Sequence, residues 1–131
     1  MREVLVGRPV ELPSQLIERF PELRAARYRR GGLPVRVGGW CLGQSTVAAI
    51  TLWRTVWLAR AVPLTADLLL HEVRHVQQFQ ASSAFPVRYL WDSLRRGYHR
   101  NRYEADARAY ARARLAAGPA GGPADRSRGD A

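Results

Sequence analysis

The chain has 131 residues and a formal net charge of +10, because its 21 basic side chains, all of them arginine, outnumber 11 acidic ones. This length fits one domain with one hydrophobic core, and an apolar fraction of 47% excludes a wholly disordered chain. The one cysteine, Cys41, excludes an internal disulfide framework and a zinc site made of cysteines alone, so we expect it to be a small, partly buried apolar residue.

The N-terminal part of the chain predicts a short helix and one extended segment. Residues 1–9 lack the apolar run of a signal peptide. A helix is predicted over residues 15–20 and ends at Pro21. Residues 23–30 favour a strand or an extended arm, and the glycine-rich segment 31–39 marks turns and loops.

Residues 47–59 are rich in β-branched and aromatic side chains. They predict either one long strand or a tight hairpin that turns near Trp53 and Arg54. At a period of two residues, four apolar side chains share one face, and the threonines and tryptophans share the other. The first face holds Ile50, Leu52, Val56 and Leu58, and the second holds Thr51, Trp53, Thr55 and Trp57.

The most apolar stretch of the chain, residues 47–70, is interrupted by Arg54, Arg60, Pro63 and Asp67. A helix that spans a bilayer needs about 20 mostly apolar residues without such charges. We therefore expect no transmembrane segment and a soluble, cytoplasmic protein.

Three helices are predicted after this stretch. The first covers residues 66–80, with the Thr65 hydroxyl suited to the N-cap. The second follows Pro86 and ends at Gly97, and the third runs over about residues 101–117. The fold class is therefore α+β, with a small antiparallel sheet or hairpin followed by three helices.

The first of these helices carries an H-E-x-x-H motif, His71-Glu72-Val73-Arg74-His75. Histidines four residues apart lie on one helix face, so both imidazoles can reach one metal ion. Zn²⁺ suits this pair, and Glu72 can take a proton from a metal-bound water instead of coordinating the metal. The composition of the chain predicts only about 0.002 matches by chance. The alternative interpretation is a helix that carries these three residues without a metal.

A catalytic zinc needs a third protein ligand. The extended motif with a third histidine is excluded, because the positions for its glycine and histidine hold Gln78 and Ala81. The other large class takes a glutamate from a later helix, and Glu104 is the candidate. His99 is the alternative ligand, and Asp106 comes third because it is better suited to support a ligating histidine.

Glu104 heads a stripe of small and apolar residues on the third predicted helix. Ala107, Ala111 and Leu115 follow it at helical spacing. A carboxylate in this position is unusual for a surface residue, and the two alanines allow close approach to the first helix. The alternative is an exposed Glu104–Arg108 pair, which is worth only a few tenths of a kcal/mol.

Several segments together resemble a known family, the small bacterial zincin-like metallopeptidase domains of the gluzincin type. The resemblance covers about residues 47–113. It rests on the hairpin-like segment 49–56, the lead-in Leu68-Leu69-Leu70, the H-E-x-x-H motif with Val76 and Gln78 after it, the Tyr/Leu/Trp-rich second helix, and the run from Asn101 to Ala107.

This resemblance implies a minimal zincin-like domain over residues 1–117, with a disordered Gly/Pro/Ala-rich tail over 118–131 expected from composition. It implies a zinc ion on His71, His75 and Glu104, with Glu72 as general base. The substrate would be a peptide or a protein.

The resulting hypothesis is a zinc metallopeptidase in which a Glu72-activated, zinc-bound water attacks the peptide bond. The tetrahedral oxyanion needs a hydrogen-bond donor, and we expect Tyr103 in that role. Tyr98, Tyr110 and His99 are alternatives. The strand at 47–59 offers an edge for an extended peptide substrate.

Two other functions stay open at this point: a catalytically silent metal-binding scaffold or interaction module, and an arginine-rich nucleic-acid-binding protein. Residues 24–36 hold five arginines and no acid, and residues 88–114 hold eight arginines and three acids. Such clusters can bind phosphates. The chain has no recognisable nucleic-acid-binding motif, so we favour a solvated arginine surface over a nucleic-acid partner.

Overall fold

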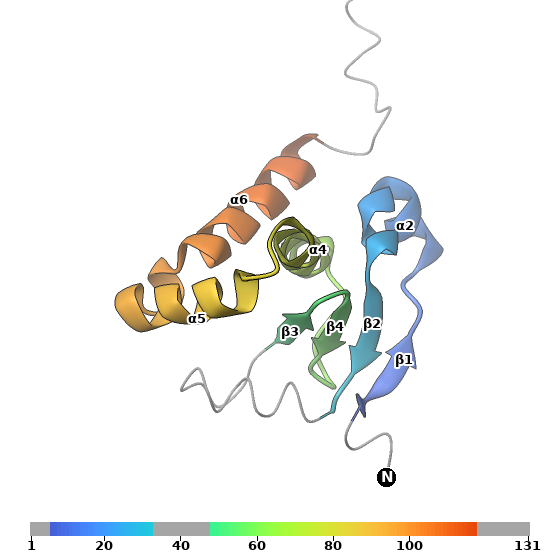
Figure 1. Ribbon diagram of the computed structural model, residues 1–131. Helices are drawn as coiled ribbons and strands as arrows, with labels where there is room; N and C mark the ends of the chain where they lie inside the picture. Colours follow the sequence, from blue (N-terminus) through green and yellow to red (C-terminus); the bar gives the residue numbers. More distant parts are fainter. Residues whose placement is uncertain (1–5, 33–47, 118–131) are drawn as a thin grey trace, which may run out of the picture.

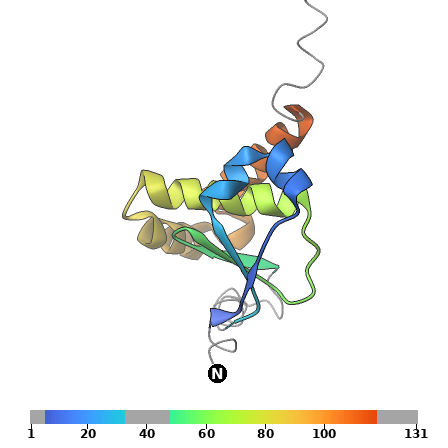
Figure 2. The same cartoon turned by 90° about the vertical axis from the view of Figure 1, so that its right-hand side faces the viewer.

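The computed structural model describes residues 6–32 and 48–117, with the backbone alone described at Tyr98. They form a small four-stranded sheet packed against helices, an α+β arrangement (Figure 1, Figure 2). Cys41 and the tail over 118–131 lie outside the described residues. The elements are β1 (Arg8–Val10), α2 (Ser14–Arg19), the 3₁₀ helix η1 (Pro21–Ala25), β2 (Arg27–Arg30), β3 (Ala49–Leu52), β4 (Thr55–Leu58), α4 (Ala66–Ala81), α5 (Phe85–Arg96), the 3₁₀ helix η2 (Tyr98–Arg100) and α6 (Arg102–Ala117).

The sheet is mixed, which corrects the expectation of a small antiparallel sheet. Its strand order is β1-β2-β4-β3. β1 pairs with β2 and β3 pairs with β4 in antiparallel fashion, but β2 and β4 are parallel, with Tyr28 opposite Val56. The reason is topological: β3 is the outer strand of the sheet, and the hairpin brings β4 back beside β2 and parallel to it.

The segment predicted as a strand or hairpin is a hairpin, β3–β4, which turns at Trp53 and Arg54. The predicted division of its side chains into two faces is wrong for β3. Thr51 lies opposite Val56, and both are buried on the face towards the core, whereas Ile50 lies on the other face with Trp57. A two-residue turn pairs even-numbered with odd-numbered positions, so a period of two counted through the turn assigns β3 to the wrong face.

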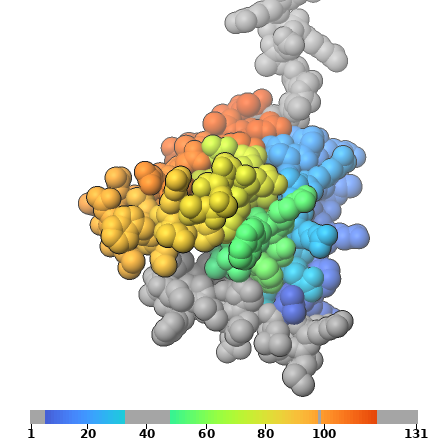
Figure 3. All heavy atoms as spheres, in the orientation of Figure 1, coloured from blue at the N-terminus to red at the C-terminus, as the bar shows by residue number. Residues whose placement is uncertain are grey.

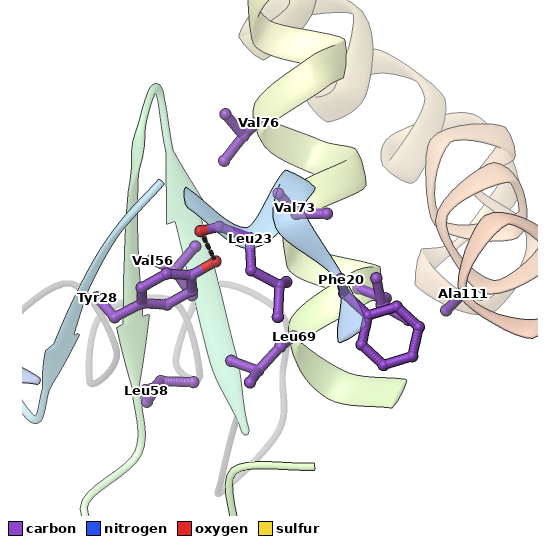
Figure 4. Close-up of a cluster of buried hydrophobic side chains, with 10 residues drawn as sticks. Phe20, Leu23, Tyr28, Val56, Leu58, Leu69, Val73, Val76 and Ala111 are labelled. Carbon is purple, nitrogen blue, oxygen red and sulfur yellow. Dashed lines mark hydrogen bonds between the residues drawn. The ribbon is translucent and has the colours of Figure 1, made fainter. Parts of the chain in front are cut away.

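The hydrophobic core lies between α4, the sheet and the N-terminal helices (Figure 4). Figure 2 shows α4 running across the sheet. The Tyr28 hydroxyl donates a hydrogen bond of 2.8 Å to the Leu23 carbonyl, which ties η1 to the edge of this core. The fully buried side chains at its centre are Phe20, Leu23, Val56, Leu58, Leu69, Leu70, Val73 and Val76.

The three helices predicted after the hairpin agree with α4, α5 and α6. The Thr65 side chain accepts a hydrogen bond of 3.2 Å from the Leu68 amide, as expected of an N-cap. α6 packs along α4 through Ala107 and Ala111, which are fully buried, and the absence of larger side chains lets the two helices approach closely. None of the helices in the described part of the chain is long and apolar enough to cross a membrane.

A buried asparagine fixes the start of α6 relative to α5. The Asn101 Oδ1 accepts hydrogen bonds from the amides of Tyr103 and Glu104, at 2.8 and 3.3 Å. Its Nδ2 donates to the Tyr89 carbonyl at 3.0 Å and to the Ser93 hydroxyl at 2.7 Å. The residue is 0% exposed. This cap determines where the first turn of α6, and therefore Glu104, lies against α4.

Candidate metal centre

Two helices bring three potential metal ligands together. α4 presents His71 and His75 one turn apart, with ring centroids separated by 5.0 Å, and the first turn of α6 presents Glu104 between them. The His71 Nε2 lies 2.8 Å from the Glu104 Oε2, and the His75 Nε2 lies 3.1 Å from the Glu104 Oε1. The sequence-derived candidates thus converge on one point.

The size and chemistry of this cluster fit a zinc ion. One ligand atom from each of the three side chains lies within 4.8 Å of the others. A tetrahedral zinc with bonds near 2 Å holds its ligand atoms about 3–4 Å apart. Two imidazole nitrogens and one carboxylate oxygen form a donor set that zinc accepts while it keeps a position open. No other group of three His, Cys, Asp or Glu side chains within residues 6–32 and 48–117 meets the same distance criterion.

The cluster is buried, and this burial determines its charge. Burial alone would raise the pKa of the Glu104 carboxyl, but hydrogen bonds from His71, His75 and Tyr89 outweigh it and lower that pKa well below its usual range. Burial alone would lower the pKa of His75, but Glu104 and Glu72 raise it to about 9. In the metal-free protein, His75 therefore carries a proton that a metal ion must displace.

A chain of hydrogen bonds determines which nitrogen of His75 faces the cluster. The Gln78 amide nitrogen donates to the Tyr103 carbonyl at 3.0 Å and to the Asp106 carboxylate at 2.9 Å. Both of these partners only accept, so the Gln78 Oε1 must be the group that lies 2.7 Å from the His75 Nδ1. The His75 Nδ1 therefore donates, which leaves its Nε2 lone pair for a metal.

Arg74, a charged residue inside the motif, belongs to the same hydrogen-bond network that orients His75. Its guanidinium lies 2.7 Å from the Asp106 carboxylate, a contact that lowers the pKa of that carboxyl. It also donates to the Gln77 side chain at 2.7 Å and covers the ring of Tyr110. Asp106 thus supports His75 through Gln78 and is itself held by Arg74.

Glu72 lies beside the cluster and is held from the sheet. The Thr51 hydroxyl on β3 donates a hydrogen bond of 2.7 Å to the Glu72 Oε2. Glu72 is 6% exposed, and its charge is close enough to raise the pKa of His75. This contact exists because Thr51 lies on the inner face of the hairpin, whereas the period of two in the sequence predicted it on the face opposite to Val56 and Leu58.

Tyr89 is a site residue that sequence reasoning did not single out. Its hydroxyl donates a hydrogen bond of 2.7 Å to the Glu104 Oε1, and its ring packs edge-on against His75 with centroids 6.1 Å apart. The sequence pattern that would indicate an inward-facing Tyr89 is weak. Phe85, Tyr89 and Asp92 form the inward face of α5, but a second, more apolar set of side chains on the same helix obscures it.

The other candidates whose side chains the structure describes are not part of the cluster of three ligands. The Tyr103 ring packs edge-on against Phe85 at 5.1 Å, and its carbonyl accepts from Gln78. Tyr110 contacts Glu22 through its hydroxyl at 3.4 Å. His99, the alternative ligand, is an exposed residue of η2. The side chain of Tyr98 is not among those described.

Comparison of the chain with protein-family models, with curated proteins and with solved structures gave no match.

Proposed function

We propose that this protein is a zinc-dependent metallopeptidase with a zincin-like site, in which His71, His75 and Glu104 hold the metal. The convergence of these three side chains, from two different helices and with both histidine Nε2 atoms directed at one carboxylate, carries the proposal. Support also comes from the hydrogen bonds of His75, which leave its Nε2 unprotonated once the metal has displaced the proton.

A zinc ion bound there would lower the pKa of water and polarise the carbonyl of a peptide bond. Glu72 then serves as the general base: it takes a proton from the attacking water and passes it to the leaving amine. The hydrogen bond from Thr51 occupies one of its two carboxylate oxygens, so the other is available for this proton transfer. Tyr103 stays our predicted oxyanion donor.

The substrate in this proposal is an extended peptide that adds to the edge of β3. β3 pairs with β4 and with no other strand in the described part of the chain. The same strand carries Thr51, which bonds to Glu72, so a peptide aligned along this edge passes the general base. Main-chain hydrogen bonds to the strand would position the scissile bond. Contacts with the side chains of the substrate would determine which peptide sequences are cleaved.

The first test compares Glu72→Gln with the unaltered protein. We expect one zinc per chain in both, by metal analysis of dialysed samples, and a loss of peptide hydrolysis of at least about 10³-fold in the variant, because the amide cannot accept the proton. Glu18→Gln, which makes the same change at an exposed position of α2, is the matched control and retains full activity.

Two results would contradict the proposal. Unchanged turnover in Glu72→Gln would exclude this residue as the base. A protein that binds one zinc per chain but hydrolyses no member of a broad peptide library would favour the silent metal-binding scaffold instead.

A further inference from the structure

Helix α5 exposes an apolar stripe to solvent. Val87, Leu90, Trp91 and Leu94 are between 60% and 75% exposed. Their spacing of three and four residues places them on one face, as in a helix that covers a core. α5 lies at one side of the molecule, where its yellow-to-orange atoms form an outward-facing edge in Figure 3.

The core of the domain does not account for this stripe, because α5 has a separate inward face. Phe85 is 4% exposed and Asp92 is 3% exposed. Tyr89, between them, bonds to Glu104. α5 therefore has one face that contacts α4 and α6 and a second apolar face that contacts no described element. Contiguous exposed apolar surface of this kind marks interaction sites.

The charges around the stripe indicate what kind of surface it fits. Arg88 and Arg95 are exposed and seven residues apart, so they line one side of the stripe. Arg96, at the C-terminal end of the helix, is also exposed, and its guanidinium pairs with the Asp92 carboxylate at 3.5 Å. Asp92, the one acidic residue of α5, is buried, and it accepts a hydrogen bond from the Arg102 amide at 2.8 Å. The exposed surface of the helix is thus apolar and cationic.

We propose that α5 docks on an anionic phospholipid bilayer and lies in the plane of its interface. In this position the stripe enters the headgroup region, with Trp91 at the boundary, and the arginines contact lipid phosphates. A second copy of the chain is disfavoured, because it would bring the same arginines together in a protein of net charge +10. An acidic protein and the segment 33–47 of this chain are the other possible occupants.

Docking would have a consequence for the candidate metal centre. The inner face of α5 holds Tyr89 against Glu104, so the centre would lie about one helix diameter, roughly 10 Å, from the lipid. The docking inference does not depend on the proposed hydrolysis. We expect Glu72→Gln to bind the same vesicles as the unaltered protein.

The test is co-sedimentation of the full chain with vesicles of phosphatidylcholine alone and of phosphatidylcholine with about 30% phosphatidylserine. We expect binding to the anionic vesicles only, weakened by added salt. The double variant Leu90→Gln/Leu94→Gln should lower the partition coefficient about tenfold or more, with an unchanged melting temperature, since both side chains are exposed.

A matched pair of charge variants separates docking by α5 from attraction by net charge. Arg88→Gln/Arg95→Gln should weaken binding about tenfold or more, because each arginine near the surface contributes to lipid attraction. Arg24→Gln/Arg112→Gln removes the same charge from exposed positions of η1 and α6 and should change binding by less than about twofold.

The opposite results would overturn the proposal. Equal losses in the two charge variants would mean attraction without a docking face. A fall in melting temperature in the leucine variant, with no vesicle binding by the unaltered protein, would assign the stripe to a contact within the chain itself. Sedimentation of the unaltered protein as a dimer, or saturable binding to an acidic protein but not to vesicles, would identify a protein partner.

Discussion

The side chain of Gln78 connects the second histidine of the motif to α6. It accepts from the His75 Nδ1 at 2.7 Å and donates to the Tyr103 carbonyl and the Asp106 carboxylate. Because its two donor contacts fix the orientation of the amide, they also fix the tautomer of His75. In the proposed zinc site, an uncharged residue would thus take the role that carboxylates often have behind zinc-ligating histidines.

We therefore predict that Gln78→Leu weakens zinc binding about 10–100-fold, by leaving His75 without the group that orients it. The measurement is a zinc titration against a chelator of known affinity. Gln77→Leu is the control, since Gln77 is the adjacent residue and bonds to Arg74 instead of His75. Equal zinc affinities for the two variants would show that Gln78 does not position the ligand.

At the scale of single residues, sequence reasoning identified the side chains whose relative positions follow from helical spacing. His71 and His75 share a face because α4 is a regular helix, and Glu104 was distinguished by the alanines that follow it. Tyr89 was missed because α5 has two apolar faces, and nothing local indicates which one turns inward. Only the packing of α5 against α4 and α6 makes that choice.

At the scale of elements, the β3–β4 hairpin determines how Glu72, the proposed general base, is held. Its two-residue turn at Trp53, where φ is 54°, shifts β3 by one position relative to a continuous strand. Thr51 consequently lies over α4 beside Glu72, with Ile50 on the outer face. The period of the sequence predicted an extended segment correctly, but a face can be assigned only once the turn is known.

This contact predicts that Thr51→Val reduces peptide hydrolysis by about tenfold while zinc content stays at one per chain. The variant keeps the shape of the side chain but leaves the Glu72 carboxylate without its donor. Steady-state kinetics should place the loss in kcat. Thr55→Val, on the opposite face of the same hairpin, is the control. A loss of similar size in both variants would indicate damage to the strand rather than to Glu72.

The sheet order is a property of the whole molecule, and the sequence did not reveal it. β3 and β4 are joined by a two-residue turn, so local signals suffice for this antiparallel pair, whereas β1 is separated from β2 by α2 and η1 and was not predicted. The parallel pair of β2 and β4 joins strands separated by a crossover, and no local pattern encodes that register. This register depends on long-range packing, in which Tyr28 of β2 and Val56 of β4 share one buried cluster with side chains of α4.

The net charge of +10 also has a different meaning in the folded molecule. Arg30 in the first arginine cluster donates to the carbonyls of Ala59 and Val62, at 3.0 and 2.8 Å, and so ties β2 to the chain after β4. Arg114 in the second cluster pairs with Glu22 at 2.7 Å and joins α6 to η1. Part of each cluster therefore stabilises the fold. The net charge alone does not distinguish these arginines from the exposed arginines of α5.

The stability of the whole molecule should couple to zinc in a pH-dependent way. In the metal-free protein the pKa of His75 is raised from 6.5 to about 9, so its protonated form stabilises the fold. This contribution is complete below pH 6.5 and disappears as the pH rises through 9. Zinc needs the neutral imidazole, so its binding strengthens about tenfold per pH unit for each proton displaced.

We therefore predict that saturating zinc raises the melting temperature more at about pH 8 than at about pH 6, whereas the metal-free protein loses part of the His75 contribution over the same interval. Thermal unfolding with zinc and with a chelator measures both effects. Glu104→Gln, which removes a charged ligand and the partner that raises the pKa of His75, should abolish most of the zinc-induced shift. Equal zinc-induced shifts at the two pH values would mean that no proton is displaced, and an undiminished shift in Glu104→Gln would place the metal elsewhere.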